Sequence, residues 1–504
     1  VGDFISAMAG IEDDGLQQAL GALVEPIRLN AGEILMNRGD EADSAYFIVT
    51  GRLEVITDDE DAAVRLLGRG EIVGEMGLLG DARRNATVRA DRDSILARLP
   101  KSDFERLALE QPGFALGMAR VVTKRLAHRR PPANSVRTVA VAVTHPGLDP
   151  ALLTSSLLET MAQSGSSIHI TGESVDRRLG LPGASHQPPG TEGWMHTAAH
   201  LDALEAEYRS VLLEADPEPS PWSVTALRHA DRVLIVMSPN PGPAEEGAGR
   251  ALSDAAGPAG HPGKWIVTVW PEGNGRPTGA AELAERYGAE RVLHVRAGSA
   301  DDTARLARLA TGTGIGLVLG GGGARGFAGL GVYRALRDLG IPIDAVAGAS
   351  MGGILAAAIA DGLDPDELIE VAATSFRKTL DYTLPLVSLI KGGRITRRIT
   401  DQFGDTEIED LELPFLCVST NLTTSRKVVH DRGSLARAIR AGSAIPGVIP
   451  PIPSNGELLV DGGVLDNLPV DHLRDTGLVD TVIAVDVAPP LGPRAKQDFG
   501  LSVS

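Results

Sequence analysis

A serine in a glycine-rich setting is the residue of this sequence best suited to chemistry. Ser350 lies within residues 348–352 (GASMG), after the apolar run 345–347 and before the small-residue stretch ILAAAIADG. A strand, a sharp turn and a helix in this order expose a serine at a helix N-terminus, where the helix dipole favours developing negative charge. The pattern predicts Ser350 as the nucleophile of a hydrolase.

A glycine loop upstream of the serine fits two kinds of chemistry. Residues 320–326 (GGGGARG) contain the dinucleotide fingerprint G-x-G-x-x-G, and Asp344 follows about 20 residues later, where a ribose-binding acid is expected. The same glycines leave backbone N–H groups for a tetrahedral oxyanion, at about 3 kcal/mol per donor. The charged Arg325 inside the turn, and the position of Asp344 before the next apolar run, weaken the dinucleotide interpretation. The nearby serine favours an oxyanion hole.

A serine nucleophile needs a base, and Asp461 is the best candidate. An apolar strand-like run delivers it into a glycine turn, LVDGG. The order Ser, Asp, His of many hydrolases would use His472 instead. His472 lies among the charged residues of PVDHLRD, which is typical of a solvent-facing helix, and His430 in KVVHDRG suits a strand or turn.

Two further regions of the sequence precede this one. Residues 1–132 are short β-type runs divided by glycines, which predict a small barrel or roll. In it, a short helix begun at Gly74 would point N–H groups at an anion. Arg84 could supply paired donors to a phosphodiester, and Glu75 could accept hydrogen bonds from a ribose hydroxyl. A helical stretch over 113–128 then ends in RRPP.

Residues 133–312 alternate apolar strand-like runs with helix-like stretches and predict an α/β layer with a mostly parallel sheet. The Pro-, Gly- and Ala-rich segment 238–262 is expected to be a loop. No GxxxxGK[ST] is present, so we expect no Walker-type phosphate cradle. His196 and His200 have a helical ligand spacing but no evident third ligand, so we expect no metal.

The gross composition limits the partners. A length of 504 residues suggests three domains. A formal charge of -18 argues against nucleic acid, while apolar surface or local basic clusters leave peripheral membrane contact open. The single cysteine, Cys417, is expected to be a buried thiol. We see no apolar run of the ~20 residues that a spanning helix needs and no signal peptide, so we expect a cytoplasmic protein, peripheral at the inner membrane face.

The motifs GGGGARG, GASMG and VDGG in combination resemble the patatin-like phospholipase domain. The resemblance implies hydrolysis of phospholipid or lysophospholipid esters by a Ser–Asp dyad without histidine, metal or cofactor. It implies that residues 443–451 (SAIPGVIPP) form an apolar mouth for an acyl chain. Fewer residues follow Asp461 than the family often has, so we expect the domain to be truncated at its C-terminus. The implied roles are Ser350 as nucleophile, Asp461 as base, the amides of Gly321, Gly322 and Gly323 as oxyanion hole, and Arg325 as a residue that stabilises this loop.

The first 132 residues resemble the cyclic-nucleotide-binding domain. The resemblance implies cAMP or cGMP as an effector, bound by Gly74, Glu75, Arg84, Asn85 and Ala86. Asn85 stands where the family usually has a small residue, which leaves the choice of nucleotide open. A cAMP-responsive transcription factor would carry a basic helix-turn-helix after the helical stretch, but the run VRTVAVAVTH there is typical of a buried strand.

The phrase SPWSVTALRHADRVLIV is similar to a segment between the nucleotide-binding and hydrolase parts of neuropathy target esterase relatives. We therefore expect a multidomain chain: a β-roll with helices over 1–132, an α/β domain over 133–312 and an α/β patatin-like hydrolase over 313–504. The predicted function is a lipid-ester hydrolase. Two alternatives stay open: an inactive patatin-fold scaffold that senses a cyclic nucleotide, and a dinucleotide-binding oxidoreductase.

Overall fold

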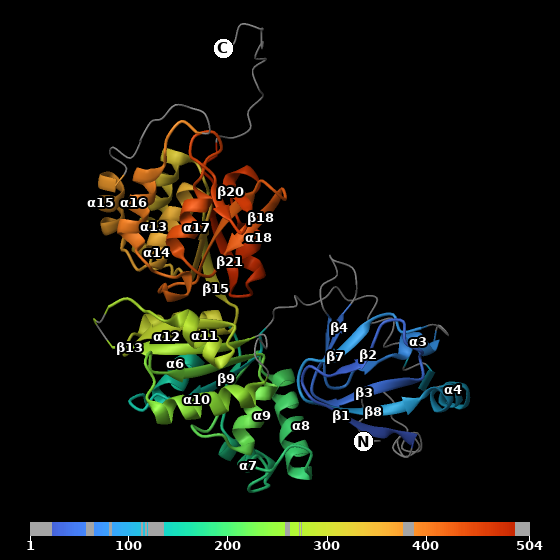
Figure 1. The fold of residues 1–504 in the computed structure, drawn as a ribbon. Helices are drawn as coiled ribbons and strands as arrows, with labels where there is room; N and C mark the ends of the chain where they lie inside the picture. The colour runs from blue at the N-terminus through green and yellow to red at the C-terminus, as the bar shows by residue number, and fades with distance from the viewer. Residues whose placement is uncertain are drawn as a thin grey trace. The chain divides into compact units, whose positions relative to one another are not determined.

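The computed structural model describes residues 23–56, 65–79, 83–111, 114–115, 118, 136–257, 263–271, 273, 275–375 and 388–488. The chain divides into two compact units (Figure 1). One consists of Val1–Val269 with Leu283–Val292, and the other of Trp270–Glu282 with Leu293–Ser504. The expected helical stretch over 113–128 lies outside the described residues except at 114, 115 and 118, and the RRPP segment lies wholly outside them.

The first unit begins with the predicted β-roll, built from two antiparallel sheets. Phe47, Leu99 and Phe104 are buried between the roll and its helices. One sheet has the order β1 (Glu25–Leu29), β8 (Ser94–Pro100), β3 (Ser44–Thr50), β6 (Ile72–Val73), and the other β2 (Ile34–Met36), β7 (Thr87–Ala90), β4 (Leu53–Ile56), β5 (Arg65–Leu67). The described helices here are α3 (Glu75–Leu79), as expected from Gly74 onward, and α4 (Lys101–Glu110).

A six-stranded α/β layer follows, and its central strands pair in parallel, as predicted. Its order is β10 (Ser167–Ile170), β11 (Ser210–Glu214), β9 (Thr138–Val143), β12 (Arg232–Met237), β13 (Lys264–Trp270), β14 (Arg291–Arg296). Its helices are α6 (Pro150–Gln163), α7 (Gly172–Leu179), α8 (Glu192–Glu207), α9 (Pro221–His229), α10 (Pro243–Ala256), α11 (Ala280–Tyr287) and α12 (Ala300–Ala310). The division between the two units falls within β13, α11 and β14.

The expectation of a loop over 238–262 is wrong, because α10 occupies most of it. Pro243 begins this helix, where its missing N–H costs nothing, and two glutamates in the first turn suit the helix dipole. The alanines are good helix formers, and Leu252 and Ala256 supply the buried face. The proline and glycine content of this segment is therefore not enough to exclude a helix.

The second unit contains a mixed sheet that carries the glycine loop, the serine and the aspartate. Its order is β19 (Ile452–Ser454), β20 (Glu457–Asp461), β17 (Phe415–Asn421), β16 (Ala345–Gly348), β15 (Gly314–Leu319), β21 (Val479–Val485), with β18 (Arg426–His430) also on β17. Its α-helices are α13 (Ala328–Asp338), α14 (Met351–Ala360), α15 (Pro365–Ser375), α16 (Gly393–Phe403), α17 (Leu435–Gly442) and α18 (Val470–Asp475). Figure 1 shows α18 on the side of the sheet away from α15 and α16.

The core of this unit explains its local sequence. Every residue of β16 is buried, and α14 is apolar on nearly all sides because it packs against β15, β16 and β17. Cys417 lies in this core, as expected, and burial raises the pKa of its thiol to about 12. No helix in the described part of the chain is long and apolar enough to cross a membrane.

Candidate active site

Ser350 lies at a strained turn between β16 and α14. Its backbone has φ 51 and ψ -124, a conformation that a residue with a side chain rarely adopts. The helix approaches the strands very closely after this turn. Glycine at position 352 permits the approach, because a Cβ there would lie 2.0 Å from the carbonyl oxygen of Leu319. These are the features of a nucleophile elbow, which holds the serine hydroxyl clear of the sheet.

Asp461 meets Ser350 although 111 residues separate them. The hydroxyl of Ser350 donates to Oδ2 of Asp461 at 2.6 Å. Strand β20 ends at Asp461 and pairs with β17 at Ser419, while β16 pairs with β17 at Cys417, so the sheet brings the two residues to one edge. The backbone N–H of Gly463 donates to Oδ1 of Asp461 at 2.8 Å and fixes the carboxylate.

Burial raises the pKa of Asp461 above its ordinary value of 3.8, and the hydrogen bonds from Ser350 and Gly463 oppose this rise without cancelling it. A raised pKa makes this carboxylate a stronger base than an exposed one. It can therefore accept a proton from a serine hydroxyl more readily.

The two histidines that competed with Asp461 have other partners. His430 shares a hydrogen bond with Ser419 at 2.7 Å, and His472 lies 3.4 Å from Asp466. The predicted pair of Ser350 and Asp461 is thus the arrangement that the geometry assembles.

The glycine loop differs from the prediction at one position. The N–H of Gly321 donates to the backbone oxygen of Asn467, so it is not a free oxyanion donor as predicted. Within the described residues, no hydrogen bond engages the N–H groups of Gly322 and Gly323. Arg325 is exposed, and its side chain forms no hydrogen bond with a described residue. Its contribution to the loop is through the backbone, where its N–H donates to the carbonyl oxygen of Gly322 at 3.2 Å.

Asp344 has a structural role that excludes the ribose contact of a dinucleotide site. It is fully buried at the start of β16 and accepts two hydrogen bonds from Arg308, at 2.9 and 2.7 Å. A third comes from the backbone N–H of Ile315. A ribose-binding acid would have to lie at the other end of the strand.

A cavity of about 240 Å³ opens at Ser350. Its wall is apolar except for a few polar groups, and Arg398 is its one charged residue among those described. Ser443, Ile445 and Ile449 line it, in the segment for which we predicted an apolar mouth. The prediction missed the contribution of α16, although its apolar residues at four-residue steps, Ile395, Ile399 and Phe403, signalled an amphipathic helix.

In the roll, Arg84 is buried and held by the protein itself. Its Nη1 donates to the carbonyl of Gly74 at 3.0 Å, and its Nη2 to Ser44 and to Asp43 at 2.8 and 3.0 Å. Its Nε is buried and has no partner among the described residues. A phosphodiester would therefore have to use Nε or displace one of these bonds.

The other predicted nucleotide-binding residues differ in their burial and in their distance from Arg84 along the chain. Gly74 adopts φ 86, and a Cβ on it would lie 2.5 Å from Nη1 of Arg84, so no other residue fits there. Glu75 is buried, Asn85 is exposed and Ala86 is half-buried. The structure thus gathers Gly74, Glu75 and Arg84 at one place.

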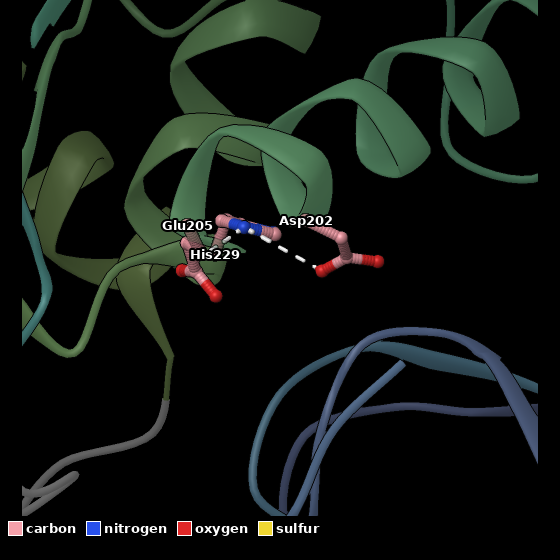
Figure 2. Close-up of side chains that lie close together, drawn as sticks. All are labelled: Asp202, Glu205 and His229. Atoms are coloured by element: carbon pink, nitrogen blue, oxygen red, sulfur yellow. Dashed lines mark ion pairs between the residues drawn. The ribbon is translucent and has the colours of Figure 1, made fainter. Parts of the chain in front are cut away.

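One group of side chains among the described residues has the composition of a metal site: Asp202, Glu205 and His229. Figure 2 shows the imidazole of His229 between the two carboxylates. Its Nε2 lies 3.3 Å from Glu205 Oε1 and 3.8 Å from Asp202 Oδ1.

An arginine already supplies the positive charge that a metal would bring to this group. Arg92, from the roll, donates to Oε1 of Glu205 at 2.8 Å, and Thr138 donates to the same oxygen at 2.5 Å. Burial raises the pKa of Asp202 to about 6, whereas Arg92 and His229 overcome burial at Glu205 and hold its pKa well below the usual range. We assign this cluster to the ionic contact between the roll and the α/β layer, and no metal to it.

Three family models match successive parts of the chain. They are a cyclic nucleotide-binding domain over residues 26–111, a Neuropathy Target Esterase family P-loop like domain over 135–311, and a patatin-like phospholipase over 317–474. The chain therefore carries a cyclic nucleotide-binding domain, a Neuropathy Target Esterase family P-loop like domain and a patatin-like phospholipase domain. The order of the three domains confirms the resemblance drawn from the motifs.

Similar fungal proteins support this assignment. "Lysophospholipase NTE1" of Phaeosphaeria nodorum is 32% identical over 97% of this chain and 37% of its own length. "Lysophospholipase nte1" of Aspergillus fumigatus is 31% identical over 95% of this chain and 36% of its own length. The chain thus spans just over a third of these esterase-family relatives.

The part of the chain that matches the P-loop like domain does not contain the Walker sequence that binds phosphate. The loop after β9 reads THPGLD, without the glycines and lysine of a Walker motif. The side chain of Asp149 caps α6 by accepting from the N–H of Ala151 at 2.9 Å. A carboxylate therefore occupies the helix N-terminus that would otherwise attract a phosphate.

Proposed function

We propose that this chain hydrolyses the acyl ester of a phospholipid or lysophospholipid, with Ser350 as nucleophile and Asp461 as base. The observation that carries the proposal is the 2.6 Å hydrogen bond between them at an apolar cavity. The cavity of about 240 Å³ beside Ser350 suits one acyl chain, which favours a lysophospholipid. The relatives' printed names agree with this choice.

The hydrogen bond between Ser350 and Asp461 supports the following reaction. Oγ of Ser350 attacks the ester carbonyl carbon as its proton passes to Oδ2 of Asp461, and the carbonyl oxygen becomes an oxyanion beside the free amides of Gly322 and Gly323. The ester C–O bond then breaks, and the departing glycerol oxygen takes the proton from Asp461. Water next attacks the acyl-enzyme with Asp461 again as base, which releases the fatty acid and restores Ser350. No step needs a metal.

Labelling with a fluorophosphonate tests the proposal without knowledge of the natural lipid. The wild-type chain is expected to react at Ser350 and to release fatty acid from a lysophosphatidylcholine, while Ser350→Ala does neither. Mass spectrometry of the labelled peptide locates the adduct. An inactive scaffold or an oxidoreductase would leave the wild-type chain unlabelled, and that result would overturn the proposal.

We propose further that the roll binds a cyclic nucleotide through Arg84, and that this binding shifts the activity. Calorimetric titration of the wild-type chain with cAMP and with cGMP is expected to show binding, which Arg84→Ala and Arg84→Lys weaken about 10–100-fold by loss of charge-assisted bonds. Arg83→Ala, which removes an exposed neighbour, serves as the control. A flat wild-type trace retires the proposal. Hydrolysis with and without nucleotide then measures the coupling.

We propose that the chain binds peripherally to the cytoplasmic face of a membrane, through the mouth of the cavity at Ser350. Leu389 and Ile445 are 49% and 40% exposed there. Hydrogen bonds from Leu389 and Ile390 to residues 447 and 448 hold their segment against the cavity loop. Lys391 follows this segment in the chain and Arg397 lies on α16, which lines the cavity; both are exposed, in a chain whose net charge is -18. A local basic and apolar rim of this kind fits an anionic lipid surface.

Vesicle flotation tests this contact. The double variant Lys391→Glu with Arg397→Glu is expected to bind phosphatidylcholine–phosphatidylglycerol vesicles at least about tenfold more weakly than the wild type, at about 1 kcal/mol per basic residue. Its hydrolysis of a soluble short-chain nitrophenyl ester should not change. The double variant Arg426→Glu with Arg474→Glu makes the same charge change on β18 and α18 and should bind normally. Equal binding by all three proteins would refute the surface.

A further inference from the structure

Asn467 holds one residue of the glycine loop from both sides. Its backbone oxygen accepts a hydrogen bond from the N–H of Gly321 at 3.2 Å, and its side-chain Nδ2 donates to the carbonyl oxygen of Gly321 at 3.0 Å. The contact is close, since a Cβ on Gly321 would lie 2.5 Å from Oδ1 of Asn467 and 3.0 Å from Cβ of Ser350. Asn467 therefore ties the glycine loop to the loop that follows Asp461.

This contact sets the direction of the next amide. In a trans peptide the C=O and the following N–H point in opposite directions. Because the carbonyl of Gly321 points at Asn467, the N–H of Gly322 points away from Asn467. No described residue accepts a hydrogen bond from that N–H, and Gly323, the next residue, lines the cavity together with Ser350.

We propose that Asn467 is a positioning residue for the oxyanion hole: by holding the Gly321–Gly322 peptide, it keeps the amide of Gly322 directed at the developing negative charge. This inference rests on the proposed hydrolase function. The hydrogen bonds of Asn467 given above go to Gly321 and not to Ser350, so its effect passes through the loop. A donor that is already oriented stabilises the oxyanion without reorganisation, which is the source of its catalytic value.

The substitution Asn467→Asp isolates the proposed contact, because it keeps the size of the side chain and replaces the donating Nδ2 by a carboxylate oxygen that repels the carbonyl of Gly321. We expect kcat on a lysophosphatidylcholine to fall about 10–100-fold with little change in KM, since removal of one oxyanion donor outright costs about 10²–10³-fold. A trifluoromethyl ketone analogue forms a tetrahedral oxyanion when the hydroxyl of Ser350 attacks its carbonyl carbon. Its affinity should fall in proportion to kcat/KM.

Asn455→Asp, in an exposed turn of the same domain, makes the same chemical change and should leave both quantities unchanged. Asn467→Ala, which removes the donor without adding the repulsion, is expected to lose less activity. It tests the same contact in case the aspartate variant misfolds. Wild-type kcat in Asn467→Asp would overturn the inference. A loss of activity explained by a lower melting temperature in both Asn467 variants, without the kcat–KM split, would also overturn it. An unlabelled wild-type chain would instead overturn the proposed function.

Discussion

Replacing Asp461 with asparagine is expected to lower kcat on a lysophosphatidylcholine about 10⁴-fold, because the variant retains the shape of the site but has no base for the hydroxyl of Ser350. In a triad a histidine accepts the proton and an aspartate only orients it. Here no histidine is bonded to Ser350 or Asp461 among the described residues, so the whole loss falls on one carboxylate. Release of fatty acid measures it.

Two further measurements make this prediction specific: the pH profile of the wild type and the stability of the Asp461→Asn variant. The acid limb of kcat/KM in the wild type is expected to lie above pH 3.8, because the raised pKa of Asp461 delays its ionisation. The protonated carboxyl stabilises the fold relative to the ionised form, and that contribution is lost as the pH rises through the raised pKa. At neutral pH the neutral asparagine should therefore melt at or above the wild-type temperature. An asparagine variant that keeps its activity would contradict the dyad.

Local patterns were enough to predict the two halves of the site separately. The apolar run, the glycines and the small-residue helix around Ser350 specify a close strand–helix approach, since even one methyl group at Gly352 would meet the end of β15. The bond between Ser350 and Asp461, in contrast, depends on the register of β16, β17 and β20, which no local pattern encodes. The LVDGG turn made Asp461 the best candidate base and the family resemblance supported the pairing, but neither gave the distance between the two side chains.

Other features could not be predicted because they depend on backbone pairing. The motif GGGGARG predicted free amides at Gly321, Gly322 and Gly323. The amide of Gly321 instead donates to the backbone oxygen of Asn467, 146 residues further along the chain. Likewise, the ionic contact of Arg92 with Glu205 joins two layers whose packing the sequence does not reveal. Arg84 was predicted as a ligand-binding residue, and its role as a buried anchor for Asp43, Ser44 and Gly74 appeared only in three dimensions.

The two substitutions Gly352→Ala and Gly331→Ala are expected to change stability in opposite directions, although both put alanine for glycine in a helix of the same domain. Helix propensity alone favours each by about 0.5–1 kcal/mol. At Gly331 on α13 nothing lies within 4 Å of the new Cβ, so that gain should appear. At Gly352 on α14 the Cβ would lie 2.0 Å from the oxygen of Leu319 and 2.8 Å from that of Gly320.

Neither of those oxygens can move as a side chain could, because both belong to the end of β15 and the start of the glycine loop. We therefore expect Gly352→Ala to destabilise the domain by about 3 kcal/mol or more, a drop of about 6–12 °C in its melting transition. The displaced loop should also slow fluorophosphonate labelling of Ser350 at temperatures where the variant is folded, whereas Gly331→Ala labels at the wild-type rate. If Gly352→Ala were as stable and as reactive as Gly331→Ala, the close contact between α14 and β15 would not be what shapes the elbow. The serine's exposure would then need another cause.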